Sequence, residues 1–107
     1  MSRQKIVEES LGPEDKTQKS YEARLEGAYG IISMSKRKLI FITEKGIFRK
    51  SYKLVLDLPY EKIKSLRTEG KYNLIIDDSE DLKHTFKSTN ITISIVENAL
   101  RKIREQF

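Results

Sequence analysis

The chain has 107 residues, a formal net charge of +5, 37% hydrophobic and 35% charged residues, and neither cysteine nor tryptophan. This length suits one domain with a small core, and the missing cysteine excludes disulfides, zinc–thiolate sites, iron–sulfur centres and thiol nucleophiles. The sequence has no apolar run near the roughly 18 residues of a membrane-spanning helix, and no signal-peptide-like apolar stretch at its N-terminus. We therefore expect a cytoplasmic protein, with association at the periphery of a membrane left open.

The basic residues are concentrated in the middle of the chain. Residues 36–71 carry eleven Lys or Arg against four Asp or Glu, a net charge of +7, whereas residues 1–35 and 72–107 each carry a net charge of −1. Such a segment can attract an anionic membrane surface, nucleic acid or an acidic protein. The alternative is a solubilising surface without a partner.

The N-terminal residues are mostly polar. After Met1, the only large apolar side chains among residues 1–20 are Ile6, Val7 and Leu11. Gly12-Pro13 then breaks the segment. A short helix over 4–11 and a disordered segment are both compatible with this pattern. We assign residues 1–10 to a loosely ordered N-terminal segment and 11–107 to the domain.

Hydrophobic periodicity predicts six or seven short strands after residue 20. Apolar and polar residues alternate through most of them, as expected for strands with one face on a core. The expected strands cover residues 21–25, 29–34, 38–43, 52–58, 63–69, 72–76 and 82–86. The strand at 38–43 is apolar on both faces, which indicates a central position. In the strand at 52–58, every second residue from Tyr52 to Leu58 is expected on one face.

The period then changes to that of a helix. Apolar residues at three- and four-residue spacing form one stripe: Ile93, Val96, Leu100, Ile103 and Phe107. Ser88, Thr89 and Asn90 lie immediately upstream and can cap the first turn. We predict a mainly β fold, a curled antiparallel sheet or barrel of six to seven strands capped by this C-terminal amphipathic helix.

This order of elements resembles the pleckstrin-homology (PH) superfold, and three local patterns are similar to prokaryotic PH-like and GRAM-like domains. The first is Leu11-Gly12-Pro13-Glu14, the second is the glycine-led hairpin over residues 30–41, and the third is the proline–tyrosine step in residues 58–63. The resemblance covers about residues 11–107. It implies a binding module rather than an enzyme.

The resemblance also implies where an anion would bind. In phosphoinositide-binding PH domains, basic residues of the first hairpin and the following strand hold the phosphates. Lys36, Arg37 and Lys38 match the hairpin, and Arg49 and Lys50 lie near the next basic position. The triplet lacks the second arginine of the Lys/Arg-x-Arg pattern, which argues against specific inositide recognition. Together with Lys53 these residues are the candidate anion- or lipid-binding site.

Other chemistry finds little support in the sequence. His84 is the only histidine and lies in phase with apolar neighbours, so we interpret it as a partly buried packing residue. The acidic run at 77–81 predicts a hairpin turn, because the sixth and twelfth positions of a calcium loop starting at Asp77 would be Leu82 and Ser88 instead of Gly and Glu. We expect no catalytic residue, no metal site and no cofactor.

We therefore predict a non-catalytic PH-like module that recognises an anionic membrane surface or an acidic protein patch through a basic face. The alternative is a protein-interaction or assembly domain without lipid binding. Some members of the superfold bind proteins, including the ubiquitin-binding GLUE-type domains, which implies a ubiquitin-like partner or a subunit of the same complex. Nucleic-acid binding ranks third; it would use the aromatic residues interleaved with basic ones, which are Phe41, Phe48, Tyr52, Tyr60 and Tyr72.

Overall fold

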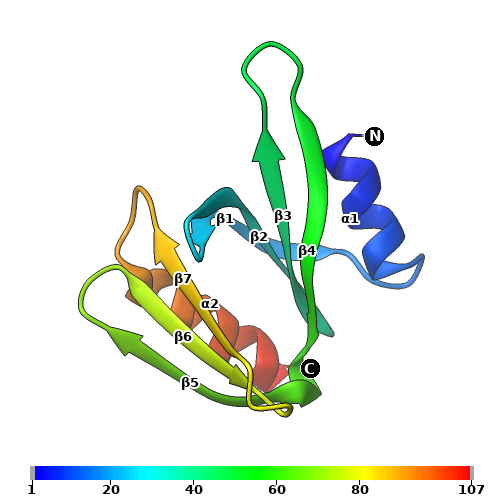
Figure 1. The fold of residues 1–107 in the computed structure, drawn as a ribbon. Helices are drawn as coiled ribbons and strands as arrows, with labels where there is room; N and C mark the ends of the chain where they lie inside the picture. Colours follow the sequence, from blue (N-terminus) through cyan, green and yellow to red (C-terminus); the bar gives the residue numbers. More distant parts are fainter. Residues whose placement is uncertain (1, 107) are drawn as a thin grey trace.

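The computed structural model describes residues 2–106, which form seven strands, two α-helices and one short 3-10 turn (Figure 1). In chain order the elements are α1 (Arg3–Leu11), β1 (Thr17–Leu25), β2 (Ala28–Ser35), β3 (Lys38–Lys45), β4 (Ser51–Pro59), η1 (Tyr60–Lys62), β5 (Ile63–Glu69), β6 (Asn73–Asp78), β7 (Lys83–Ser88) and α2 (Ile93–Gln106). Within this part of the chain, no helix is both long and apolar enough to span a bilayer.

All seven strands belong to one antiparallel sheet in the order β4-β3-β2-β1-β7-β6-β5. β1 and β7, the first and last strands in chain order, are neighbours in the sheet. The end of β1 pairs with β7, with Leu25 opposite Phe86. β4 and β5 are the two edges, so the sheet is open and not a closed barrel. The structure thus confirms the mainly β prediction with a C-terminal helix, and it is compatible with a curled PH-like sheet.

The main core lies between the concave face of the sheet and α2. Phe41 and Phe86 are fully buried at its centre, with ring centroids 5.7 Å apart and planes tilted by 59°. The expected helical stripe faces this core, since Ile93, Val96, Leu100 and Ile103 are all buried. Phe107, the last residue of the expected stripe, lies outside the described residues.

A second, smaller apolar cluster lies on the opposite face of the sheet. Helix α1 contributes Ile6 and Val7, which pack with Ile40 and Ile42 of β3. Residues 4–11 are therefore helical, which was one of the two alternatives for the N-terminal segment. The hydroxyl of Ser2 accepts a hydrogen bond from the Lys5 amide and caps the helix. β3 is thus buried on both faces, as its composition predicts, but it lies second from the edge of the sheet and not in the expected central position.

The prediction that alternate residues of β4 share one face is wrong. Phe41 pairs with Leu56 but the next residue, Ile42, pairs with Leu54, so the register shifts and leaves Val55 as an extra residue. The bulge reverses the alternation. Leu56 and Leu58 therefore pack on the main core, whereas Tyr52 and Leu54 pack against the cluster under α1.

Candidate anion-binding surface

The six basic candidates lie at opposite ends of the same pair of strands. Lys36, Arg37 and Lys38 are at the β2–β3 turn, where β3 begins, whereas Arg49, Lys50 and Lys53 lie in and beside the β3–β4 turn. β3 has eight residues, which gives a length of about 25 Å at the usual rise per residue. The structure therefore separates the candidates into two groups that cannot hold one small anion together.

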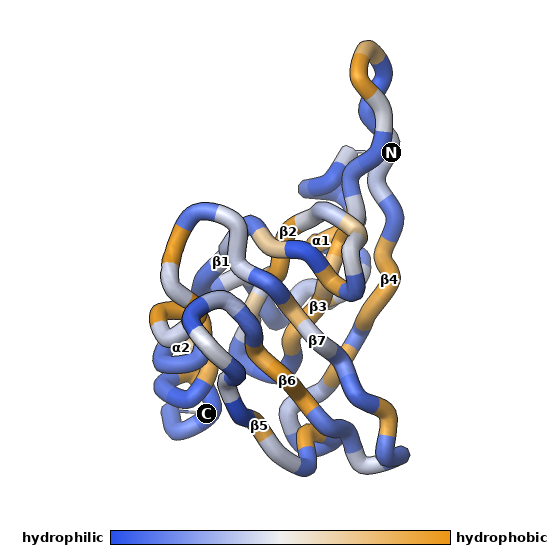
Figure 2. Tube along the Cα trace, turned by 60° about the vertical axis from the view of Figure 1, so that its left-hand side comes forward, coloured by the Kyte–Doolittle hydropathy of each residue, from blue (hydrophilic) through white to orange (hydrophobic). Residues whose placement is uncertain are grey.

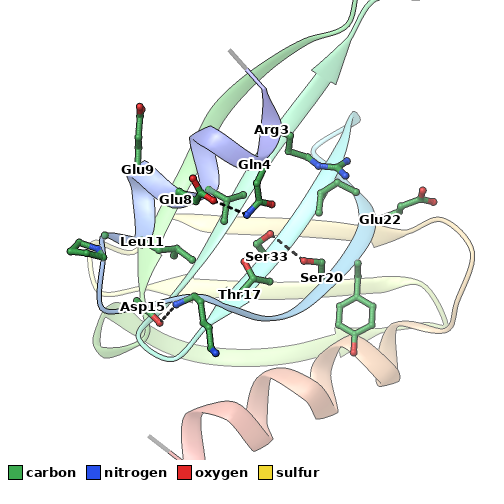
Figure 3. A pocket seen from close by; sticks show the side chains of 16 residues that line it. Arg3, Gln4, Glu8, Glu9, Leu11, Asp15, Thr17, Ser20, Glu22 and Ser33 are labelled. Carbon is green, nitrogen blue, oxygen red and sulfur yellow. Dashed lines mark hydrogen bonds between the residues drawn. The ribbon is translucent and has the colours of Figure 1, made fainter.

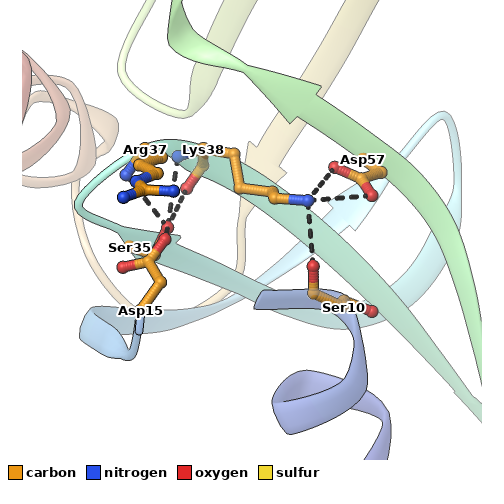
Figure 4. Close-up of polar contacts among 6 residues, drawn as sticks. All are labelled: Ser10, Asp15, Ser35, Arg37, Lys38 and Asp57. Carbon is orange, nitrogen blue, oxygen red and sulfur yellow. Dashed lines mark hydrogen bonds and ion pairs between the residues drawn. The ribbon is translucent and has the colours of Figure 1, made fainter. Parts of the chain in front are cut away.

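A carboxylate from another part of the chain binds the donors of the β2–β3 turn (Figure 4). Asp15, from the α1–β1 connection, accepts hydrogen bonds from the Ser35 hydroxyl at 2.8 Å and the Lys36 amide at 3.2 Å. The amides of Arg37 and Lys38 donate to the Ser35 hydroxyl oxygen at 3.2 Å and 3.1 Å. The backbone donors of this turn are thus satisfied within the protein.

Lys38 is also engaged inside the protein. Its ammonium group donates to the Ser10 carbonyl oxygen at 2.9 Å and lies 3.1 Å and 3.2 Å from the two carboxylate oxygens of Asp57 (Figure 4). The Lys38 side chain is only 20% exposed. It connects the end of α1 to β4.

This end also has a hollow of about 550 Å³, which the structure lines with all three candidates of the turn. Its lining consists of Lys36, Arg37, Lys38, Pro59, Tyr60, Glu61 and Arg104. The Tyr60 hydroxyl donates to the Ser35 carbonyl oxygen at 2.6 Å. Burial, and to a lesser degree the nearby Asp15 charge, raises the pKa of the Tyr60 phenol above its ordinary value. This group stays protonated and serves as a structural donor between η1 and the β2–β3 turn.

The β3–β4 turn has the opposite character. Residues 46–50 are all exposed, and the hairpin projects beyond the rest of the molecule (Figure 1). Gly46 has a φ of +103°, and a Cβ there would collide with the carbonyl oxygen of Arg49, so the turn requires glycine. At its apex Ile47 is 87% and Phe48 is 99% exposed. The hydropathy colouring shows an apolar apex on an otherwise polar loop (Figure 2).

Basic side chains surround this apex. Between residues 44 and 53 the chain has four cations and one acid, a net charge of +3; the cations are Lys45, Arg49, Lys50 and Lys53, and the acid is Glu44. Glu44 pairs with Lys50 at 3.2 Å, and this hydrogen bond and charge raise the pKa of the Lys50 ammonium. In the described part of the chain no acidic side chain forms an ion pair with the other three cations.

We call residues 45–53 the hairpin tip. The charge pattern of the sequence found three of its basic residues, Arg49, Lys50 and Lys53. Lys45 and Ile47 were not among the candidates, and Phe48 was named only as an aromatic residue for nucleic-acid binding. Two large apolar residues directly after a turn glycine were the available signal, because a turn normally uses small or polar residues at such positions.

A groove of about 850 Å³ runs between α1 and the outer face of β1 and β2 (Figure 3). Its charged lining consists of four acidic and two basic side chains, which are Glu8, Glu9, Asp15, Glu22, Arg3 and Lys16. Ser20 and Ser33 also line the groove, and their hydroxyl oxygens lie 3.3 Å apart. None of the six basic candidates lines this groove, and its net negative charge disfavours an anion.

The acidic run and the histidine join in one structural network. Asp78 ends β6 and accepts hydrogen bonds from the amides of Glu80 at 2.8 Å and Leu82 at 3.0 Å, while its other oxygen lies 2.9 Å from His84 Nε2. The His84 contact, followed by the two amide hydrogen bonds, lowers the pKa of Asp78. The histidine thus closes the β6–β7 turn. Among residues 2–106, no three His, Cys, Asp or Glu side chains are grouped as metal ligands.

No protein-family model matches the chain, and no curated protein matches it in a sequence search. The observed architecture agrees with the expected one in having seven antiparallel strands followed by a C-terminal helix. Among the described residues, the hairpin tip brings cations without an acidic ion-pair partner next to the exposed side chains of Ile47 and Phe48.

Proposed function

We propose that this protein is a non-catalytic, PH-like binding module that docks on anionic membrane surfaces through the hairpin tip. The observation that carries the proposal is the group of Lys45, Arg49 and Lys53 at a projecting end of the fold, all exposed and, among residues 2–106, without an acidic ion-pair partner. The PH-like assignment is supported by the order of seven antiparallel strands and a C-terminal helix.

The expected strength follows from the charges. A Lys or Arg close to an anionic bilayer contributes about 1 kcal/mol. The four cations of the hairpin tip are partly offset by Glu44, so the net attraction is about 3 kcal/mol and falls as salt shortens the Debye length to about 8 Å at physiological ionic strength. Because the hairpin projects, its charges can approach a flat surface together.

The β2–β3 turn is a weaker candidate for the same function. Its amide donors are already bound to Asp15 and Ser35, and Lys38 is paired with Asp57. A phosphate group would have to displace these contacts before it gained any of its own. The basic residues at this end are therefore proposed to stabilise the fold.

Flotation of the purified protein with liposomes tests this function. Neutral and anionic vesicles are compared at low and physiological salt for the wild type, for Lys45→Glu/Arg49→Glu, and for the matched control Lys36→Glu/Arg37→Glu, which changes the charge equally at the opposite end. We expect binding to anionic vesicles only, a loss of at least about thirtyfold in the hairpin variant and a much smaller loss in the control. Equal losses would place the binding surface elsewhere, and absence of binding at low salt would overturn the function.

A second candidate function is interaction with a protein through the free edge of β4. β4 has a strand neighbour on one side only, and an exposed edge can accept an extended segment of a partner. This candidate predicts slower amide exchange along residues 51–58 when a partner is added, with no reversal by salt. Docking through the hairpin tip predicts salt-reversible protection of residues 45–53 on anionic vesicles instead.

A further inference from the structure

The apolar apex of the hairpin is unusual among the exposed apolar side chains of this protein. The other large exposed ones, Val55, Tyr72, Leu82 and Ile95, are between 43% and 56% exposed, so each is partly packed on the fold. Ile47 and Phe48 are adjacent and almost wholly in solvent. Single exposed apolar residues are common on protein surfaces and need no functional explanation. Ile47 and Phe48 differ because they are adjacent and because packing on the fold does not explain them.

The position of the pair matters as much as its exposure. Ile47 and Phe48 follow Gly46, whose left-handed backbone conformation allows the turn, and they lie at the outermost part of the projecting hairpin (Figures 1 and 2). A flat surface can therefore meet them before it meets the body of the protein. The two side chains can move from water into an apolar environment without any break in the pairing between β3 and β4.

The surrounding cations match this apex to an anionic bilayer. Lys45, Arg49 and Lys50 lie within three residues of the apolar pair along the chain. Their long side chains can extend toward the phosphate groups while the apolar pair lies deeper, as interfacial segments do when they bury an apolar face about 5–10 Å into the headgroup and acyl boundary. Charge complementarity thus identifies the occupant as an anionic lipid surface.

We propose that Ile47 and Phe48 form an apolar wedge that enters the acyl boundary of an anionic bilayer, so that docking retains a salt-resistant component and one orientation. This inference rests on the proposed function, since the cations bring the wedge to the surface. Attraction by charge alone would disappear at high salt and would leave the two side chains in water.

The absence of cysteine makes a direct test possible. A single Phe48→Cys variant labelled with an environment-sensitive nitrobenzoxadiazole dye reports only on the apex, and a Leu82→Cys variant serves as the control, because Leu82 lies in the β6–β7 turn at the other end of the molecule (Figure 1). With anionic vesicles we expect the dye at 48 to shift to blue emission and to be quenched by lipids brominated along the acyl chain. The dye at 82 should keep its emission in water.

Unlabelled variants test the salt-resistant component. Ile47→Ser/Phe48→Ser is compared with the wild type and with the control Leu82→Ser in flotation at increasing salt. We expect the double variant to lose at least about tenfold in binding at physiological salt and to retain binding to anionic vesicles at low salt. The control should bind like the wild type.

The outcomes separate the wedge from the proposed function. Salt-reversible binding with the dye at 48 remaining in water, or with the double serine variant equal to the wild type, would overturn the wedge while membrane docking stands. No binding of the wild type at low salt would overturn both. A blue shift at 48 that appears without vesicles as the protein concentration rises would overturn the wedge by placing the apex in a contact between two copies.

Discussion

The same substitution should change different properties at two phenylalanines of this chain, folding stability at Phe86 and membrane binding at Phe48. Phe86 is fully buried in the main core and contacts Phe41 through tilted rings 5.7 Å apart. Phe48 is 99% exposed at the hairpin apex. Alanine at position 86 should therefore cost folding free energy, whereas alanine at position 48 should leave folding unchanged and weaken membrane binding.

The magnitudes follow from burial. Replacing a core phenylalanine by alanine costs about 3–5 kcal/mol, of which the contact between the two rings contributes about 0.5–1.5 kcal/mol. An exposed side chain without packing partners changes the free energy of unfolding by less than about 0.5 kcal/mol. With a urea m-value of about 2 kcal/mol per molar, Phe86→Ala lowers the midpoint by about 1.5–2.5 M and Phe48→Ala by less than about 0.25 M.

Urea titration followed by circular dichroism measures both midpoints. Because domains of this size have only about 5–15 kcal/mol of stability, Phe86→Leu is a milder companion, and we expect it to cost less than about 1.5 kcal/mol. A Phe48→Ala midpoint lowered as far as that of Phe86→Ala would refute the assignment of the apex to solvent. An unchanged midpoint for Phe86→Ala would refute the assignment of the core.

Three further changes test other parts of the structure by urea titration. Gly30→Ala should cost about 1–3 kcal/mol, because its Cβ would collide with the Ile42 carbonyl oxygen; an unchanged midpoint would contradict that close approach. Ile6→Ala should cost about 2 kcal/mol if α1 packs as described, and a value near zero would mean that the helix is not bound to the sheet. The lowered pKa of Asp78 means that its contacts, including His84, stabilise the fold above the ordinary aspartate pKa of 3.8 and lose this effect as the pH falls through the lower folded-state value. Asp78→Asn should therefore flatten the acid side of the stability profile, and a profile of unchanged steepness would assign that slope to other groups.

The fold could be predicted because the hydrophobic pattern changes its period where the structure changes. The two-residue period from Tyr21 onward and the three-to-four-residue spacing from Ile93 correspond to the strands and to α2. The bulge at Val55 could not be placed in this way, since every second residue from Tyr52 to Leu58 is apolar on both sides of it. Its place is decided by the register with β3, which is a relation between strands and not a local property.

The candidate site was only partly predictable for the same reason. Local charge identified the basic residues on both sides of β3, but not that Asp15, twenty residues before Ser35, occupies the β2–β3 turn. Nor did it show that Lys38 pairs with Asp57, nineteen residues later. Such long-range contacts decide which cations are available, and they require the folded chain.

Burial of β3 on both faces makes the base of the β3–β4 hairpin rigid. The main core holds one side and α1 holds the other, so the strands that carry the tip are fixed before any partner arrives. A rigid hairpin loses little conformational entropy on binding, which leaves more of the contact free energy for affinity. If the hairpin tip docks as proposed, the body has to follow the orientation of the tip, and the N-terminal helix would then help to set the orientation of the whole protein on the membrane.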